Sequence, residues 1–468
     1  MSTLKSKFLV LFVASCVGLS VIGCSRDDSS TSSTITEARI TRIDTDYKDI
    51  IDNTSFAGIQ AQIIYPISTL VGMRFVYPYK DPMGNPTMLS GMICIPKTLY
   101  DSEDKKAQGI MLYNHHTIMT DYECPSYGNV GDKGALGLKE ISALGLKVTI
   151  SSLIIDNIAI GRENHKMITV AADYYGFGET GSKLQYYCEG NYNARASLEA
   201  LKAAKKLLSE RGYTWGDYLL NVGYSQGGQT AIAVQKFVDS GEYSEKISAT
   251  FAGSGPYDLT ATYKSYLDVQ AEERDVSVVV YPVLSFNEYK VLGINYGLAF
   301  RPALTEKINE WFFSKNYTRE EIDRKIKDAG MKSLSKAFSD ALLNVDSDMS
   351  KKLVAQLDTV TLTKGWTPKS DDRLYLFYSK KDTFVPPVNC EDMVEFFRSK
   401  NFTITEKPNV DLTTLVLTTI AEGTAIFDNR PKAGEVVVRI SNDMTHEDGG
   451  SIWMLDVISE MKAQFPKN

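Results

Sequence analysis

The stretch NVGYSQGGQT, residues 221–230, joins an apolar run to a run with helical character. Glycine is unfavourable inside either kind of element, yet three glycines crowd this junction. Its centre, GYSQG, has the pattern G-x-S-x-G. A sharp strand-to-helix turn would lift the hydroxyl of Ser225 clear of a sheet, with Gly223 and Gly227 avoiding collisions on either side. The stretch therefore predicts a nucleophilic serine, and the alternative is a glycine-rich connection whose serine is incidental.

A serine hydroxyl is a weak nucleophile at neutral pH and needs a neighbouring base. The chain has four histidines, His115, His116, His165 and His446. His446 lies in NDMTHEDGG, after the strand-like run EVVVRIS and before a final helical run. A loop at the end of that strand would carry it over the sheet, so we predict that His446 is the base. His165 precedes a strand and is expected at the opposite end of the sheet.

The base needs an acid that holds its tautomer and stabilises the imidazolium. Asp382 lies in SKKDTFVPP, directly after a strand-like run and between the serine and the histidine in chain order. The rivals Asp443, Glu447 and Asp448 are neighbours of the histidine in sequence. Neighbours so close seldom reach Nδ1 of the same ring. We therefore predict Asp382 as the acid.

Acyl transfer also needs hydrogen-bond donors for the oxyanion. The backbone N–H of Gln226, directly after the serine, is the first candidate. The second is expected from the loop NHHT (114–117), at the end of another strand-like run. Both His116 and Thr117 are candidates there.

The order of elements along the chain indicates an α/β fold. Two apolar-rich runs flank the turn DPMGNP (81–86), which predicts a β-hairpin. Strand-like and helical runs then alternate, which is typical of a mostly parallel central sheet flanked by helices. Between residues 260 and 370 the chain is mostly helical and rich in aromatic residues. We interpret this segment as a helical cap inserted into one core and placed over the serine; its aromatics either form the cap core or line an acyl pocket.

These pieces resemble the α/β-hydrolase fold and, within it, the secretory lipase/esterase group. The resemblance runs from about residue 70 to the C-terminus. It rests on YNHHT (113–117), ADYYGFG (172–178), GYSQGG (223–228), AGSGPYDL (252–259), SKKDTFVP (379–386) and THEDGG (445–450). It implies a carboxylic ester hydrolase that uses no metal or cofactor. Family members usually have His-Gly-Thr in the oxyanion loop, and here His116 takes the glycine position, which leaves the second donor open.

The N-terminus has the layout of an export signal. Two lysines precede the apolar run FLVLFVASCVGLSVIG (8–23), which ends at a lipobox-like Val-Ile-Gly before Cys24. We predict a lipoprotein signal peptide over 1–23, lipidation of Cys24 and a flexible tether over 24–45, with a plain signal peptide as the alternative. The core would then occupy 46–259 and 371–468. The protein is expected to be exported and lipid-anchored to the outer membrane.

Charge and cysteine content indicate whether nucleic acid, zinc or a disulfide is to be expected. The chain of 468 residues has a formal net charge of −7 and no long basic run, so nucleic acid is not an expected partner. The spacings of the cysteines match no zinc pattern. Export permits a disulfide, and Cys124–Cys188 is the candidate pair, with free buried thiols as the alternative.

The sequence as a whole predicts a lipid-anchored serine hydrolase that cleaves a small-molecule or lipid ester. One alternative is a serine peptidase of the prolyl-oligopeptidase kind. Those enzymes usually carry a β-propeller before the catalytic part, and only about 70 residues precede the hairpin here. The other is a catalytically inactive surface binding lipoprotein on the same scaffold.

Overall fold

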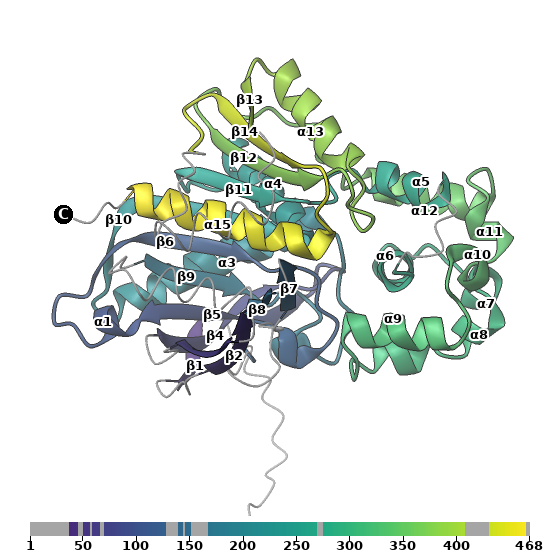
Figure 1. The fold of residues 1–468 in the computed structure, drawn as a ribbon, viewed down its shortest axis with the longest axis horizontal. Coiled ribbons are helices and arrows are strands. Elements are labelled where there is room, and N and C mark those ends of the chain that lie inside the picture. Colours follow the sequence, from purple (N-terminus) through teal and green to yellow (C-terminus); the bar gives the residue numbers. More distant parts are fainter. Residues whose placement is uncertain are drawn as a thin grey trace, which may run out of the picture. The chain divides into compact units, whose positions relative to one another are not determined.

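The computed structural model describes residues 37–44, 50–56, 59–65, 70–127, 139–143, 146–150, 167–268, 275–407 and 430–464. The signal peptide, Cys24 and His165 lie outside these ranges, as does most of the predicted tether. Ten strands form one sheet in the spatial order β1-β4-β5-β9-β6-β10-β11-β12-β14-β13 (Figure 1). Their bounds are β1 (Arg39–Asp44), β4 (Leu70–Lys80), β5 (Pro86–Pro96), β9 (Met167–Ala172), β6 (Lys106–Asn114), β10 (Thr214–Tyr224), β11 (Ala249–Gly253), β12 (Arg373–Ser379), β14 (Glu435–Ser441) and β13 (Thr403–Lys407).

The sheet is antiparallel at one side and parallel over the rest. Strands β1, β4, β5 and β9 pair antiparallel, and every pairing from β9 onward to β13 is parallel. The predicted mostly parallel sheet and its opening β4–β5 hairpin are therefore confirmed. Two further pairs are antiparallel, β2 (Ile50–Phe56) with β3 (Ile59–Tyr65) and β7 (Lys139–Ala143) with β8 (Leu146–Ile150).

The predicted tether over 24–45 needs a correction at its end. Residues Arg39–Asp44 form the edge strand β1, which pairs with β4. In this strand the side chains of Ile40 and Arg42 are half-buried, whereas those of Thr41 and Ile43 are exposed, as expected of an edge strand with one face toward the sheet.

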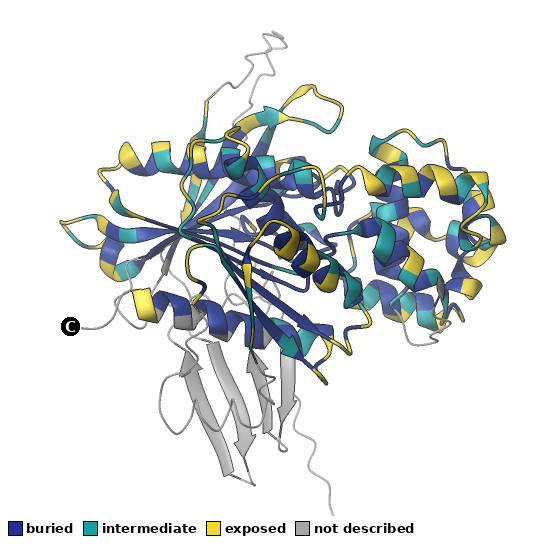
Figure 2. Cartoon of the chain, turned by 90° about the horizontal axis from the view of Figure 1, so that it is seen from above, coloured by how far each residue is buried: buried dark blue, intermediate teal, exposed yellow. Residues whose placement is uncertain are grey.

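Helices cover both faces of the sheet, because apolar side chains of its strands point to both faces. In β12 the side chains of Leu374 and Leu376 join one apolar cluster, while Tyr375 and Phe377 join another. The first cluster includes residues of α3 (Gly190–Ser209), α4 (Gln226–Asp239) and α13 (Val388–Ser399), and the second includes α15 (His446–Gln464). Because successive strand residues point to opposite faces, these helices lie on opposite sides. Figure 2 shows the central strands of the sheet buried along most of their length.

Residues 259–358 form a helical insertion, called the cap below, which Figure 1 shows beyond one end of the sheet. It has an apolar core of its own, to which Tyr281, Phe286 and Trp311 belong, so most of its aromatics stabilise the cap itself. Its elements are α5 (Leu259–Asp268), α6 (Ser277–Tyr289), α7 (Tyr296–Ala299), α8 (Pro302–Thr305), the π-helical turn η4 (Asn309–Phe313), α9 (Arg319–Asp328), α10 (Leu334–Ala337), α11 (Asp340–Leu343) and α12 (Asp348–Asp358). The short helices outside it are α1 (Lys97–Tyr100), η2 (Asp121–Glu123) and η3 (Gly178–Thr180).

The candidate Cys124–Cys188 disulfide is not formed, and the alternative of free buried thiols is the one that the structure shows. Cys124 packs with Ile118 and Phe177, whereas Cys188 belongs to the apolar core of the cap. Burial in these two separate clusters raises the pKa of both thiols, which disfavours the thiolate needed for disulfide exchange.

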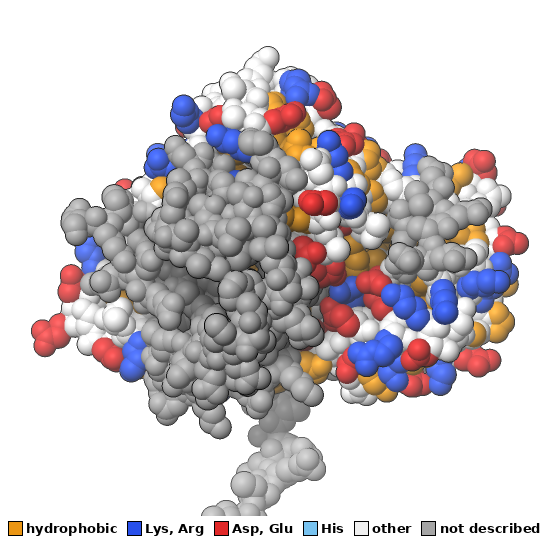
Figure 3. Space-filling model, in the orientation of Figure 1, with side chains coloured by type: hydrophobic (Ala, Val, Ile, Leu, Met, Phe, Trp, Pro, Cys, Tyr) orange, Lys and Arg blue, Asp and Glu red, His pale blue; other side chains and the backbone are white. Residues whose placement is uncertain are grey.

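The surface carries charges of both signs. Figure 3 shows acidic and basic side chains interspersed over the described part of the visible face, including the cap. Among the described residues, no helix is long and apolar enough to cross a membrane.

Candidate active site

The turn around Ser225 has the strained geometry that its sequence predicts. Strand β10 ends at Tyr224 and α4 begins at Gln226, so Ser225 alone joins the two elements. Its backbone has φ 58° and ψ −125°, a region that residues with a side chain rarely adopt. The peptide is held there because the Ser225 N–H donates to the carbonyl of Gly253 at 2.8 Å. Strain that is stabilised by its surroundings is typical of functional sites.

Two glycines make this turn possible through close backbone approach. A Cβ at Gly223 would lie 2.0 Å from the carbonyl oxygen of Gly227, and a Cβ at Gly227 would lie 2.0 Å from that of Asn114. Both obstacles are backbone atoms, which no rotamer change can move. Glycine is therefore required at both positions for packing, and the second contact places the predicted oxyanion loop against the start of α4.

The structure brings Ser225, His446 and Asp382 into one hydrogen-bonded chain. Nε2 of His446 lies 2.9 Å from Oγ of Ser225, and Nδ1 lies 2.7 Å from Oδ2 of Asp382. The other carboxylate oxygen accepts hydrogen bonds from the N–H groups of Phe384 (2.9 Å) and Val385 (2.8 Å), which fixes the carboxylate plane. All three members are buried. This is the geometry in which an imidazole can take the serine proton while the carboxylate holds its tautomer.

The rival carboxylates are engaged elsewhere. Asp448 accepts from the hydroxyl of Thr445 at 2.8 Å, and Glu447 pairs with Arg319 of the cap at 3.1 Å. Asp443 lies 3.4 Å from the hydroxyl of Ser441. The selection of Asp382 by chain order therefore agrees with the geometry.

His446 is the first residue of α15 rather than a residue of the preceding loop, so the position of this helix sets the position of the imidazole. Its carbonyl accepts from the Tyr224 hydroxyl at 2.6 Å, which ties the helix start to the nucleophile turn. Further along, Asp456 forms two hydrogen bonds with Arg439, at 2.6 and 3.1 Å, and accepts a third from Tyr375. These buried contacts fasten α15 to β12 and β14.

The loop after β6 lies beside the nucleophile. The ring of His115 is held between backbone carbonyls, with Nδ1 2.7 Å from O of His116 and Nε2 3.2 Å from O of Asp173. The hydroxyls of Thr117 and Tyr187 lie 2.9 Å apart. Gln226 is the first residue of α4, so no carbonyl of that helix can accept its N–H. Gln226, with His116 or Thr117, stays the prediction for the oxyanion donors.

Comparison with known proteins bears on the fold. No protein-family model matches the sequence, and no curated protein matches it either. A crystal structure of a hydrolase from Legionella pneumophila, described as putative, matches with a TM-score of 0.61 at 20% identity, over 86% of this chain and 93% of that one. The rice cell wall degrading esterase LipA from Xanthomonas oryzae matches with a TM-score of 0.61 at 17% identity, over 89% and 97%. Candida antarctica lipase A in its closed state matches with a TM-score of 0.54 at 10% identity, over 85% and 79%.

The chain has an α/β-hydrolase fold. The mixed ten-stranded sheet, its flanking helices and these structural neighbours agree on this point. Identities of this size establish the fold alone.

The hydrolase core and the cap enclose a pocket that begins at Ser225. Its volume is about 550 Å³, including its opening to solvent. Among the described residues that line it, none is charged. Its wall includes Leu259 and Tyr263 of α5, Val279 and Val283 of α6, Leu353 and Leu357 of α12, and Phe384 and Val385. Its tyrosine hydroxyls are occupied, because Tyr263 donates to O of Leu342 at 2.6 Å and Tyr266 donates to O of Phe384. An uncharged alkyl or acyl group suits such a pocket.

The sequence analysis did not identify two residues that lie beside His446. Phe384 stacks on the His446 ring, with ring centroids 4.8 Å apart, and Arg319 of the cap lies over the Phe384 ring. Phe384 could have been noted because it follows Asp382 so closely. Arg319 gives no such signal, since it lies far from both triad segments in sequence. Among the described residues, no group of His, Cys, Asp or Glu has the arrangement of a metal site.

The buried ring of His115 gives the hydrolase core a pH-dependent stability. Burial lowers the pKa of His115 to about 4. The folded protein therefore binds this proton less readily than the unfolded chain, whose histidine titrates near 6.5. The part of the unfolding free energy that depends on a neutral His115 is fully present above pH 6.5 and is lost as the pH falls toward 4. We expect about 2 kcal/mol of unfolding free energy to be lost between pH 7 and pH 5 through this group.

The measurement is urea unfolding of the wild type and of His115→Gln at pH 7 and pH 5. The variant is expected to be less stable at pH 7 because it loses the ring's packing on Tyr174, whose centroid lies 4.1 Å away. Its loss of stability between the two pH values should nevertheless be smaller than that of the wild type by about 2 kcal/mol. Equal losses in both proteins would contradict the assignment.

Proposed function

We propose that the protein is a serine hydrolase that cleaves carboxylic esters. The observation that carries the proposal is the chain of contacts from Asp382 through His446 to Ser225, at the base of an uncharged pocket. Structural likeness to proteins described as an esterase and a lipase supports it.

The residues would act as follows. Ser225 attacks the ester carbonyl while Nε2 of His446 takes the hydroxyl proton. The N–H of Gln226, with a second donor from His116 or Thr117, stabilises the oxyanion. His446 then gives its proton to the leaving alcohol, which forms the acyl-enzyme. Water, deprotonated by the same imidazole, releases the acid and regenerates the serine.

The lining of the pocket favours a substrate whose acyl chain has several methylene groups. Most of its wall consists of aliphatic and aromatic side chains, many of them from three cap helices and the loop after β12. Each methylene buried there contributes about 0.8 kcal/mol, which corresponds to roughly a fourfold gain in kcat/KM. The gain should stop once the chain fills the pocket.

The test is hydrolysis of nitrophenyl esters from acetyl to palmitoyl by the full chain. We expect kcat/KM to rise about three- to fourfold per methylene from acetyl through the medium chain lengths and then to level off or fall. A parallel panel of aminoacyl nitroanilides should be cleaved far more slowly. Preference for the anilides would favour a serine peptidase instead, and inactivity toward both panels together with no labelling by a fluorophosphonate would favour a binding protein.

We further propose, from the sequence alone, that the protein is exported and anchored to the outer membrane through lipid on Cys24. The apolar run over 8–23 and the lipobox-like Val-Ile-Gly before the cysteine support this. Two or more acyl chains would give stable anchoring. Incorporation of labelled palmitate into the wild type but not into Cys24→Ala is the measurement that tests it.

A further inference from the structure

The two residues that flank His446 on the side of the cap both belong to triad segments. Phe384 follows Asp382 by two positions, and its N–H donates to that carboxylate at 2.9 Å. Its ring stacks on the imidazole with an interplanar angle of 23°. Glu447 directly follows His446 in the first turn of α15. Movement of either residue would therefore move the imidazole or its carboxylate partner.

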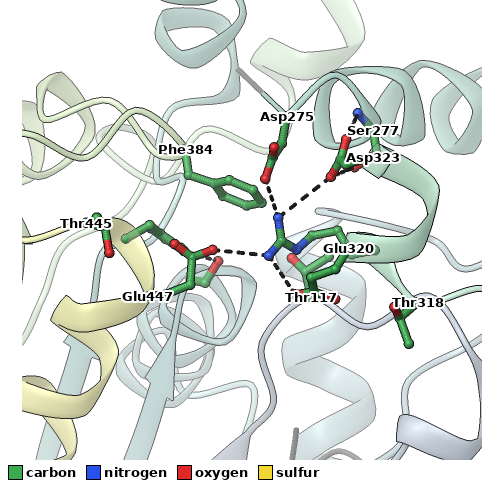
Figure 4. Close-up of polar contacts among 12 residues, drawn as sticks. Thr117, Asp275, Ser277, Thr318, Glu320, Asp323, Phe384, Thr445 and Glu447 are labelled. Carbon is green, nitrogen blue, oxygen red and sulfur yellow. Dashed lines mark hydrogen bonds and ion pairs between the residues drawn. The ribbon is translucent and has the colours of Figure 1, made fainter. Parts of the chain in front are cut away.

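One cap side chain contacts both of these residues. Nη2 of Arg319 lies 3.1 Å from Oε1 of Glu447, and the guanidinium carbon lies 4.7 Å from the centroid of the Phe384 ring. Figure 4 shows Phe384 and Glu447 next to each other, opposite Asp323 and Glu320. Arg319 is the first residue of α9, so the contact joins the cap to the triad.

Arg319 is itself firmly held. Its guanidinium also lies 2.6 Å from carboxylate oxygens of Asp275 and Glu320 and 3.7 Å from that of Asp323, and the side chain is only 10% exposed. Asp323 in turn accepts from the N–H and the hydroxyl of Ser277, at 2.9 and 2.7 Å. Contacts with several carboxylates through both terminal nitrogens give the planar guanidinium a defined orientation, which the single ammonium group of a lysine cannot reproduce. The guanidinium is thus fixed relative to the start of α6, the helix that also lines the pocket.

We propose that Arg319 is a positioning residue for His446, through Phe384 and Glu447. The proposal rests on the proposed ester hydrolase function. Arg319 contacts neither Ser225 nor the ring nitrogens, so it takes no proton. Its role is to keep the imidazole aligned with Oγ of Ser225 while the cap is packed against the core. Proton transfer from Ser225 to His446 is then efficient only when the cap, which forms the acyl pocket, is in place.

The test compares Arg319→Met, Arg319→Lys and Arg301→Met in the full chain. Arg301 is the matched control, because it is a cap arginine whose ion pair with Asp340, at 2.9 Å, is exposed. The substrate is nitrophenyl acetate, whose acyl group is too short to depend on the pocket. We expect Arg319→Met to lower kcat about 10- to 100-fold, with KM changed less than about threefold. Arg319→Lys should recover part of the loss, and Arg301→Met should keep the wild-type kcat.

A double variant separates positioning from a general loss of stability. If Arg319 acts through Phe384, Arg319→Met combined with Phe384→Leu should lose little more kcat than the worse single variant. Effects that multiply would contradict the proposal, as would an Arg319→Met protein with the wild-type kcat or with a change in KM alone. Thermal unfolding checks that each variant folds. If Arg319→Met does not fold, kcat and KM are compared for Arg319→Lys instead, alone and combined with Phe384→Leu.

A second readout does not need turnover. The proton on Nδ1 that faces Asp382 should give a downfield NMR resonance, identified by its loss in His446→Gln. We expect it to broaden or vanish in Arg319→Met and to persist in Arg301→Met. Persistence in Arg319→Met would overturn the proposal. A wild type that cleaves no ester would instead overturn the proposed function, and the resonance would still decide the role of Arg319.

Discussion

Replacing Ser225 with alanine is expected to lower kcat for ester hydrolysis by about 10⁴- to 10⁶-fold. In the proposed mechanism Oγ is the atom to which the acyl group is transferred, and no other described hydroxyl shares its contact with Nε2 of His446, at 2.9 Å. Alanine removes only this atom from a buried position, so the fold should be retained. The measurement is single-substrate kinetics on a medium-chain nitrophenyl ester, with circular dichroism to verify the fold.

The double variant Ser225→Ala/His446→Ala provides the control. Residues that act as one unit lose their contribution together, so the double variant should be no slower than the slower single variant by more than a small factor. A Ser225→Ala protein with near wild-type activity would disprove the nucleophile. Losses that multiply in the double variant would instead indicate that the serine and the histidine act in separate steps.

The triad could be read from the sequence because each member is tied to a local signal. Ser225 lies in a glycine pattern that only a tight strand-to-helix turn requires, and Asp382 lies in the loop after a strand. His446 was the only histidine expected beyond the last strand. Since the carboxyl ends of neighbouring parallel strands meet at one edge of a sheet, correct strand assignment was enough to bring these residues together.

Contacts between distant segments left no such signal. The pairing of Arg319 with Glu447 joins residues that are 128 positions apart, and nothing in either segment specifies the other. The choice between a Cys124–Cys188 disulfide and free thiols stayed open for the same reason, because spacing does not reveal that the two thiols pack in different apolar clusters. Strand β1 was assigned to a flexible tether because its pairing with β4 depends on a partner about 30 residues away.

Glycine at position 227 is the second feature whose loss should have a large effect. Gly227→Ala is expected to destabilise the protein by more than the roughly 1–3 kcal/mol typical of overpacking in a core. The added Cβ would lie 2.0 Å from the carbonyl oxygen of Asn114 and 2.9 Å from that of His115. Both are backbone atoms, so α4 or the oxyanion loop must move, and either movement also displaces Ser225 or the oxyanion donors. We expect a lower urea midpoint and, in the folded fraction, a large loss of kcat.

Gly297→Ala is the matched control for this prediction. Gly297 lies in the exposed part of α7, and the only described atom close to its added Cβ is a carboxamide oxygen of Asn295, at 3.3 Å. Alanine is favoured over glycine inside a helix by up to about 1 kcal/mol, so this variant should be as stable as the wild type or slightly more stable. If Gly227→Ala behaved like Gly297→Ala, the close approach of the oxyanion loop to α4 would be wrong. The placement of the predicted oxyanion loop beside Ser225 would then lose its structural basis, because that placement depends on the same approach.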